Sequence, residues 1–260
     1  MISTSTSYQL IMKDLQKSLE RTGSNPIVAR DTKYYLENIG KVKTVDDFVG
    51  NHRLYSYAMK ASGLEDMIYA KAFMKKVLNE GIDDKESFAN RLSDTRYKEF
   101  AAVFNFARYG ELTTSFSAAQ QGTVDKYIRQ TLEVSAGEED QGVRLALYFA
   151  RKAPEIKNPF DILADRALLQ VVQTALGIPQ EASSGSIDAQ AAMIKNKLNI
   201  EDLKDPKQVD RFLKRFTIIW DAKNNAATSP ILTLFTGASS SSGLGADILV
   251  SLQNIKRGGV

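Results

Sequence analysis

The amino-acid sequence predicts an all-α, multi-helical globular domain, and three observations carry this prediction. Apolar residues recur at three- and four-residue spacing along most of the chain, as they do in helices with one buried face. A capping residue followed directly by proline, which is typical of a helix start, occurs at Asn25-Pro26 and at Asp205-Pro206. Strand-like alternation bounded by tight Asn-Gly or Asp-Gly turns is not found in the sequence.

The composition is that of an ordinary globular protein. Of the 260 residues, 43% are hydrophobic and 25% are charged, which argues against extensive disorder. Domains commonly contain roughly 100–200 residues, so the length suits one large domain or two small ones. No apolar run in the sequence approaches the roughly 18 residues that a membrane span needs, so we expect no membrane span.

The core helices follow from their caps and apolar stripes. Asn25-Pro26 opens a helix that ends near Gly40, and Thr44 opens the next segment with acidic residues near the positive end of the helix dipole. After Gly63 the spacing predicts a helix over residues 64–80. The apolar stripe of the helix after Asn25-Pro26 consists of Val28, Tyr34, Tyr35 and Ile39, and that of the helix over residues 64–80 consists of Met67, Ala70, Phe73, Met74 and Val77. The helix after Asp205-Pro206 has the stripe Val209, Phe212, Leu213, Phe216 and Trp220.

The chain divides into three parts by composition. Residues 1–22 are predicted to form a leader and a helix, residues 23–222 the helical core, and residues 223–260 a flexible linker with a short C-terminal helix. The leader Met1–Tyr8 is polar and lacks the pattern of a cleavable secretory signal. Asn224–Gly245 is rich in Ser, Gly, Thr and Ala, which is typical of a flexible linker.

Two short apolar stripes, one near each end of the chain, are the candidate partner-binding residues. Isolated helices shorter than roughly 12–15 residues are marginal in water, so each stripe should dock on this chain or on a partner. If the protein acts in assembly, the core should fold without either segment. The stripes are formed by Leu10, Ile11, Leu15 and Leu19, and by Ile248, Leu249, Leu252 and Ile255 within Ala246–Ile255.

Two stretches of the chain resemble each other at an offset of 114 residues. Residues 42–64 and 156–178 share five identities in 23 ungapped positions, together with several exchanges of one apolar residue for another. Two divergent copies of a small helical unit, over residues 42–106 and 156–222, would explain the match. Chance agreement between amphipathic helices that end in glycine would explain it almost as well, because apolar periodicity alone produces such matches.

The charges give no sign of nucleic-acid binding. The chain has 34 basic and 31 acidic residues and a pI of about 8.8, and the two signs are mixed along its length. The densest basic segment is expected to be the solvated face of an amphipathic helix. That segment comprises Lys204, Lys207, Arg211, Lys214 and Arg215.

The sequence offers no catalytic, cofactor-binding or metal-binding residues. Cysteine is absent, which excludes disulfides and thiolate chemistry, and His52 is the single histidine, expected at the surface. Gly243-Leu244-Gly245 follows no strand and lacks the third glycine of a dinucleotide loop. The triplet Glu138-Glu139-Asp140 most simply supplies negative charge to a helix start. The aromatic residues at helical spacing are expected in the core: Tyr97, Phe100, Phe104, Phe106, Tyr148 and Phe149.

Three stretches are specific enough to suggest a family. They are Tyr57–Leu78, with YAMKASGLEDM and YAKAFMKKVL; Phe88–Phe106, with FANRL; and Gly137–Asp165, with GVRLALYF, RKAP and DILAD. Together they resemble an uncharacterised alphaproteobacterial domain-of-unknown-function family whose members lie in or near flagellar gene clusters. The similarity covers roughly residues 40–220. The family has no known activity or catalytic residues to transfer to this chain.

The resemblance implies association with the flagellum. We therefore expect a non-enzymatic protein without a cofactor that acts through contacts with a protein partner, either flagellar components or further copies of itself. The alternative is a cytoplasmic adaptor or export chaperone for flagellar subunits. Under these hypotheses the protein would be located in the cytoplasm or, after export through the flagellar pathway without a cleavable signal, in the flagellum. An enzyme is the third hypothesis, and a deep pocket with several ionisable groups would favour it.

Overall fold

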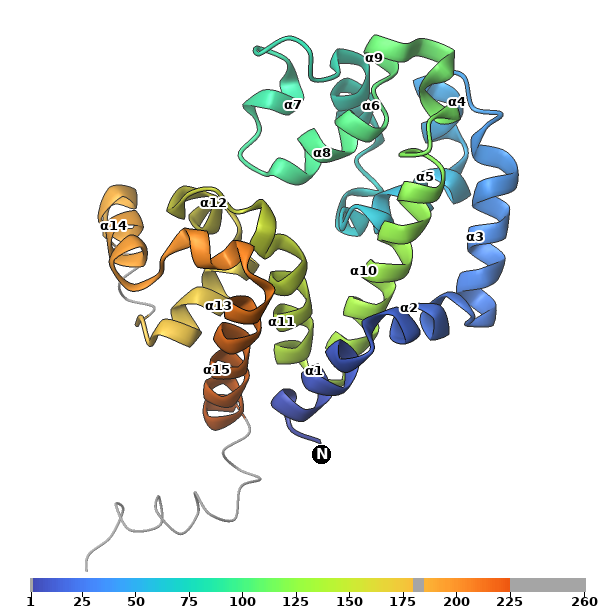
Figure 1. Cartoon of the computed structure of the whole chain (residues 1–260). Helices are drawn as coiled ribbons and strands as arrows, with labels where there is room; N and C mark the ends of the chain where they lie inside the picture. Colours follow the sequence, from blue (N-terminus) through green and yellow to red (C-terminus); the bar gives the residue numbers. More distant parts are fainter. Residues whose placement is uncertain (1, 180–184, 225–260) are drawn as a thin grey trace, which may run out of the picture.

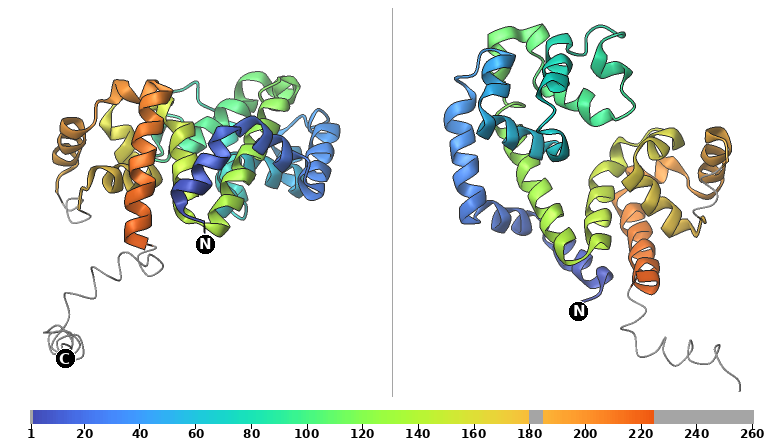
Figure 2. Two further views of the ribbon diagram at one scale, coloured as in Figure 1. Left: turned by 60° about the horizontal axis from the view of Figure 1, so that its bottom comes forward. Right: turned by 180° about the vertical axis from the view of Figure 1, so that it is seen from behind.

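The computed structural model describes residues 2–179 and 185–224, and this part of the chain is helical without strands (Figure 1). The prediction of an all-α fold is therefore confirmed. The helices gather in two lobes with separate hydrophobic cores, which lie side by side in both views of Figure 2. The linker and terminal helix predicted beyond Asn224 lie outside the described residues.

The first lobe is built from short helices joined by tight turns. Its cap residues match the sequence prediction, since Asn25 caps the first helix and Thr44 forms a capping box with Asp47 at the second. The elements are α3 (Pro26–Ile39), α4 (Val45–Gly50), α5 (His52–Ala61), η1 (Glu65–Met67), α6 (Lys71–Glu80), α7 (Phe88–Arg91), α8 (Thr95–Val103), α9 (Phe106–Tyr109) and η2 (Gly110–Ser115).

Aromatic rings fill the centre of the first lobe. The ring of Phe48 on α4 lies 4.7 Å from that of Phe104 and 6.3 Å from that of Phe100, measured between ring centroids. A second group stacks Tyr57 between Tyr35, at 4.4 Å, and Tyr127, at 3.8 Å. Such aromatic pairs contribute beyond the area they bury, so α8 and its C-terminal end close this core tightly.

The second lobe contains α11 (Gln141–Lys152), η3 (Ala153–Glu155), α12 (Pro159–Ala164), α13 (Arg166–Leu176), α14 (Ile187–Lys197), η5 (Ile200–Lys204) and α15 (Pro206–Asn224). Its core is mostly aliphatic, and α15 packs against α11 and α13 with the buried residues Val209, Leu213 and Phe216. Phe212 and Trp220 are partly buried beside them, so the stripe predicted after Asp205-Pro206 faces the core.

The long helix α10 (Gln121–Glu139) joins the two lobes (Figure 1). Its first half carries Val124 and Tyr127, which belong to the first core, and its last turns bring Ala136 against the second core. The helix packs along α5 at one end and along α11 at the other. One continuous helix therefore takes part in both cores.

The N-terminal segment differs from the sequence prediction. Residues 4–8 are not a leader but the start of α1 (Thr4–Lys13), which packs against α11 and α15 of the second lobe. The side chain of Tyr8 is 1% exposed in the second core, and the hydroxyl of Thr4 donates to Asp140 at 2.5 Å. The predicted single helix is also interrupted, since Asp14 ends α1 and caps α2 (Leu15–Gly23), which lies on α10. The apolar Tyr8 had the spacing of a core residue, but its polar neighbours concealed it.

The helix predicted over residues 64–80 is shorter than expected. Gly63 has a positive φ of 68°, and the amide of Leu64 then donates to the carbonyl of Met59, which turns Leu64 into the core. The chain forms η1 and a turn before α6 begins at Lys71. The apolar periodicity continued across this interruption because the turn residues are themselves packed against the core.

Corresponding helices of the two lobes share order and local geometry. The four helices α3–α6 of the first lobe correspond in order to α11–α14 of the second. In each set the first, or entry, helix packs on the third, and the short second helix packs on the third and the fourth. Asn158 forms a capping box with Asp161, as Thr44 does with Asp47. Gly177, like Gly63, has a positive φ, of 64°. At the offset of 114 residues these buried positions coincide in the two lobes: Val28 and Gly142, Tyr35 and Phe149, Ile39 and Ala153, Val42 and Ile156, Phe48 and Ile162, Leu54 and Leu168, Ala58 and Val172, Ala61 and Ala175, and Leu64 and Ile178.

The buried position of Tyr8 yields a prediction about stability. Replacing Tyr8 by Ala should lower the free energy of unfolding by about 3–5 kcal/mol, because a large aromatic side chain is removed from a packed core. Leu10→Ala is the matched control on the same helix, since Leu10 is 60% exposed, and it should change stability by less than about 0.5 kcal/mol. Urea denaturation followed by far-ultraviolet circular dichroism measures both. Equal stability of the two variants would mean that α1 is not part of the second core.

Candidate functional site

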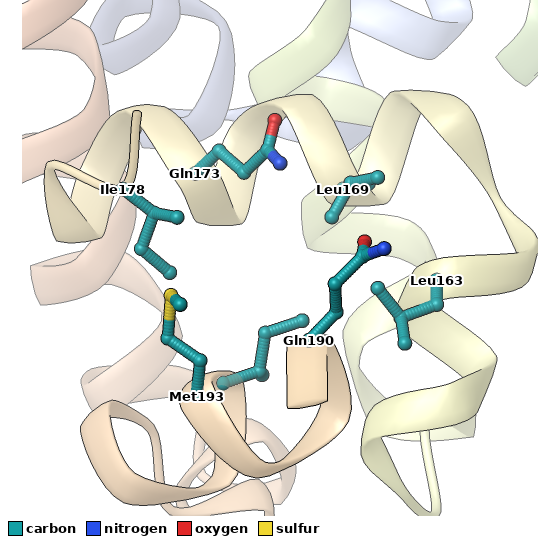
Figure 3. A pocket seen from close by; sticks show the side chains of 7 residues that line it. Leu163, Leu169, Gln173, Ile178, Gln190 and Met193 are labelled. Carbon is teal, nitrogen blue, oxygen red and sulfur yellow. The ribbon is translucent and has the colours of Figure 1, made fainter. Parts of the chain in front are cut away.

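The second lobe has an apolar groove between α12, α13 and α14 (Figure 3). We call it the α12–α14 groove and define it by its lining residues. Its cavity holds only about 10 Å³, room for about one water molecule, so it does not suit a small-molecule ligand. Leu163, Leu169 and Met193 in its lining are only partly buried, so apolar side chains of another element can pack against them. The lining residues are Leu163, Leu169, Gln173, Ile178, Gln190, Met193 and Ile194.

A second, more polar hollow adjoins the groove. It holds about 210 Å³ and shares Gln173 and Ile178 with the α12–α14 groove. On its other side it is lined by Trp220 and by Lys223 and Asn224, the last residues of α15. The two hollows are therefore neighbours on the second lobe, with the C-terminal end of α15 beside the polar one.

A buried carboxylate lies where α10 and α11 pack together. Glu133 is 1% exposed and receives hydrogen bonds from the guanidinium groups of Arg129, at 2.9 Å, and Arg151, at 2.8 and 2.9 Å. Arg129 also donates to the backbone carbonyl of Leu147 on α11. Because a buried carboxylate is costly unless it is paired, this cluster joins α10 and α11 through one shared charge.

Further polar contacts continue along the boundary between the lobes. Lys152 on α11 forms ion pairs of 2.8 Å with Glu99 on α8 and with Glu155. The hydroxyl of Tyr148 donates to Asp165, the cap of α13. These contacts tie the first lobe and the start of α13 to α11.

The titration behaviour of this boundary follows from its pairing. Burial opposes the charged form of Arg151, but hydrogen bonds to Glu133 hold its pKa above the ordinary value. Burial also opposes the charged form of Lys152, but its pairing with Glu155 and Glu99 holds its pKa above the ordinary value. Burial, and then the hydrogen bond to Asp165, raise the pKa of the Tyr148 hydroxyl. Both cations thus stay charged at neutral pH, and the boundary holds a fixed set of ion pairs.

The predicted partner-binding residues are only partly brought together by the fold. Leu10 is exposed on α1, whereas Ile11 is partly buried against the second core. Leu15 and Leu19 lie on α2 and are half-buried, so the four residues do not form one helix face. The C-terminal set, Ile248, Leu249, Leu252 and Ile255, lies outside the described residues. Partner binding by either set stays a prediction.

Other sequence expectations are met in the described part of the chain. His52 is exposed at the start of α5, and Asp140 caps α11 by accepting from the amide of Gly142. The prediction for the acidic triplet holds for Asp140 alone, because Glu138 and Glu139 lie in the last turn of α10. The basic segment from Lys204 to Arg215 presents its cations to solvent. Among the predicted core aromatics Tyr148 is half-buried, and these are buried: Tyr97, Phe100, Phe104, Phe106 and Phe149. Gly243-Leu244-Gly245 lies outside the described residues.

The described residues form neither a metal-binding cluster nor a membrane-spanning helix. No group of three or more His, Asp or Glu side chains is arranged to hold a metal ion within residues 2–179 and 185–224. No helix in those ranges has both the length and the apolar character of a membrane span.

The fold and its grooves define an all-α, two-lobed protein with an apolar surface groove, and the comparisons give its family. Residues 61–209 match the model of a family described as a protein of unknown function, DUF1217, and the chain belongs to this family. The crystal structure of protein AGR_C_984 from Agrobacterium tumefaciens is similar to this chain, with 52% sequence identity and a TM-score of 0.79. The match covers 86% of this chain and 97% of that one. A search of curated proteins found no match.

Sequence reasoning missed both the α12–α14 groove and the Glu133 cluster. The groove residues Leu169 and Met193 occupy positions that fit a fully buried helix stripe equally well. Glu133 sits four residues after Arg129, a spacing that is also common on exposed helix faces. The one indication in the sequence that this turn is enclosed is that both neighbours of Glu133, Leu132 and Val134, are apolar.

The shared charge of Glu133 yields a second prediction. Glu133→Gln removes the carboxylate and leaves two guanidinium groups without their counter-charge, so the free energy of unfolding should fall by about 3–5 kcal/mol. Glu201→Gln breaks the exposed ion pair with Lys204 and should cost less than about 1 kcal/mol. Urea denaturation at low salt measures both variants. A loss at Glu133 no larger than that at Glu201 would contradict the role of the cluster.

Proposed function

We propose that this protein is a non-enzymatic, flagellum-associated component that acts through protein–protein contacts, as a structural or assembly factor. The observation that supports the contact role is the α12–α14 groove, whose lining is apolar and whose cavity is too small for a small molecule. Two exposed apolar side chains, Phe160 and Ile187, lie on the helices that border it and enlarge the apolar surface of this lobe.

The flagellar part of the proposal rests on the family resemblance. The stretches from Tyr57 to Asp165 resemble alphaproteobacterial proteins encoded in or near flagellar gene clusters. The similar protein comes from Agrobacterium tumefaciens, which is an alphaproteobacterium, and this supports the resemblance to that family.

An adaptor or export chaperone for flagellar subunits is the second candidate. The same groove supports it, because an apolar groove between helices can hold an amphipathic helix of a client protein. Location separates the two functions. A protein found only in the cytosol, bound to an export substrate, would be an adaptor, and one found in the assembled flagellum would be a structural component.

We also infer that the two lobes derive from one duplicated helical unit. The matching order of α3–α6 and α11–α14, the paired capping boxes and the coincident buried positions support this inference. The match begins at the entry helices, upstream of residues 42 and 156, so the unit we infer is longer at its start than the sequence comparison indicated.

Deletion and complementation test the proposed function. Deleting the gene should reduce swimming and filament assembly, and the wild-type gene should restore both. A groove variant, Leu169→Lys with Met193→Lys, should fail to restore them, because two charged ends would block an apolar contact. The matched control is Leu112→Lys, a 65% exposed apolar residue of the other lobe, which should restore them fully.

Thermal melting of the purified groove variant shows whether it is folded, since long lysine stems can keep apolar contacts while the charge reaches water. Normal swimming and normal flagella after deletion of the gene would overturn the flagellar role. Full restoration by a folded groove variant would overturn the role of the groove.

A further inference from the structure

We propose that the α12–α14 groove is the docking site of this chain's own C-terminal segment, Ala246–Ile255. The sequence predicts that segment to be a short amphipathic helix with an apolar stripe, and it lies outside the described residues. The inference identifies what occupies the groove and rests on the contact role of the groove proposed above.

The first lobe shows what closes such a groove. At the offset of 114 residues the groove residues Leu163, Leu169, Gln173 and Ile178 correspond to Val49, Tyr55, Met59 and Leu64. All of these first-lobe residues are fully buried, whereas the first three groove residues are only half-buried.

A helix makes the difference between the lobes. In the first lobe, α8 packs against α6, and its Tyr97 and Phe100 meet the rings of Phe73 and Phe48. In the second lobe the helix that follows α14 is α15, which packs against α11 and α13 instead. In the described residues α14, the counterpart of α6, has no helix in the place that α8 takes on α6, and the apolar groove lies beside α14.

The chain leaves the described structure at the right place to supply that helix. Asn224 ends α15 and lines the polar hollow, which shares Gln173 and Ile178 with the groove. Residues 225–245 connect it to Ala246. A flexible chain of 21 residues would have an average end-to-end distance of about 25 Å. This exceeds the length of α13, about 16 Å at 1.5 Å per residue, so a chain of this length is long enough to connect Asn224 with the groove.

Tethering favours the chain's own segment over that of a second copy. A short flexible tether gives an effective concentration on the order of 1 mM. A groove that binds the free segment with a dissociation constant of about 0.1 mM would then be occupied in about nine molecules out of ten, whereas a second copy at micromolar concentration would seldom compete. The apolar stripe Ile248, Leu252 and Ile255 has the i, i+4, i+7 spacing of a helix that inserts into a groove.

The absence of cysteine in the natural sequence makes a direct test possible. The full-length protein would carry Met193→Cys in the groove and Leu252→Cys in the segment, and disulfide formation under mild oxidation would be followed on non-reducing gels. A disulfide requires Cα atoms within about 7 Å, so it reports close contact. We expect a monomeric cross-linked species that forms about tenfold faster than in the matched control, Leu112→Cys with Leu252→Cys, because docking holds the two sulfur atoms together.

A third protein tests the apolar stripe. Adding Ile248→Asp and Ile255→Asp to the Met193–Leu252 cysteine pair should reduce the rate to that of the control, because the charges prevent docking. Equal rates for the groove and control pairs would overturn the proposal. Cross-linked dimers in place of monomers would overturn it in favour of a second copy as the occupant.

The measurement uses purified protein and is independent of motility. Rapid monomeric cross-linking together with unaltered flagella after gene deletion would leave the docking intact and remove the flagellar function. Lost motility after deletion without groove-specific cross-linking would do the reverse.

Discussion

The buried carboxylate of Glu133 is the interaction on which the arrangement of the two lobes depends. A carboxylate removed from water carries a desolvation cost of several kcal/mol, and it is tolerated only when opposite charges and hydrogen-bond donors surround it. Arg129 supplies these from the same helix and Arg151 from α11, so the two helices share one buried charge where they pack. Because α10 extends into the first core and α11 begins the second, this charge lies where the two lobes are joined. The Lys152–Glu99 pair adds a second link across the same boundary.

The two lobes use related helices but complete their cores differently. The first lobe is closed by α8 and by the aromatic side chains around Phe48, which leave its helices tightly covered. The second lobe is covered on one side by α15 and by α1, and Tyr8 on α1 is buried in its core. Its other side keeps the α12–α14 groove. The two cores therefore differ in how completely the described helices cover them.

The two ends of the chain therefore have different structural roles. The N-terminal helix is held by apolar burial at Tyr8 and by polar contacts of Thr4 with Asp140 and Asp221, which lie on the second lobe. The close approach of Trp220 at this point requires Gly142, since a Cβ there would lie 2.4 Å from the indole ring. A segment anchored in this way is part of the core of the second lobe. The C-terminal stripe is instead separated from the end of α15 by residues 225–245.

The sequence by itself determined the fold class and most helix starts, since these depend on local interactions. Apolar spacing, the capping residues Asn25 and Thr44 and the proline after Asp205 act within one or two turns and can be recognised without knowledge of the rest of the chain. Only the tertiary structure decided that Tyr8 is a core residue, that Glu133 is buried and that the groove residues Leu169 and Met193 are left half-covered. Each of these features depends on where another helix packs, either the next helix, as α11 is for Glu133, or one distant in sequence, as α15 is for Tyr8. Periodicity shows which face of a helix is apolar, but the packing of the other helices decides whether that face is covered.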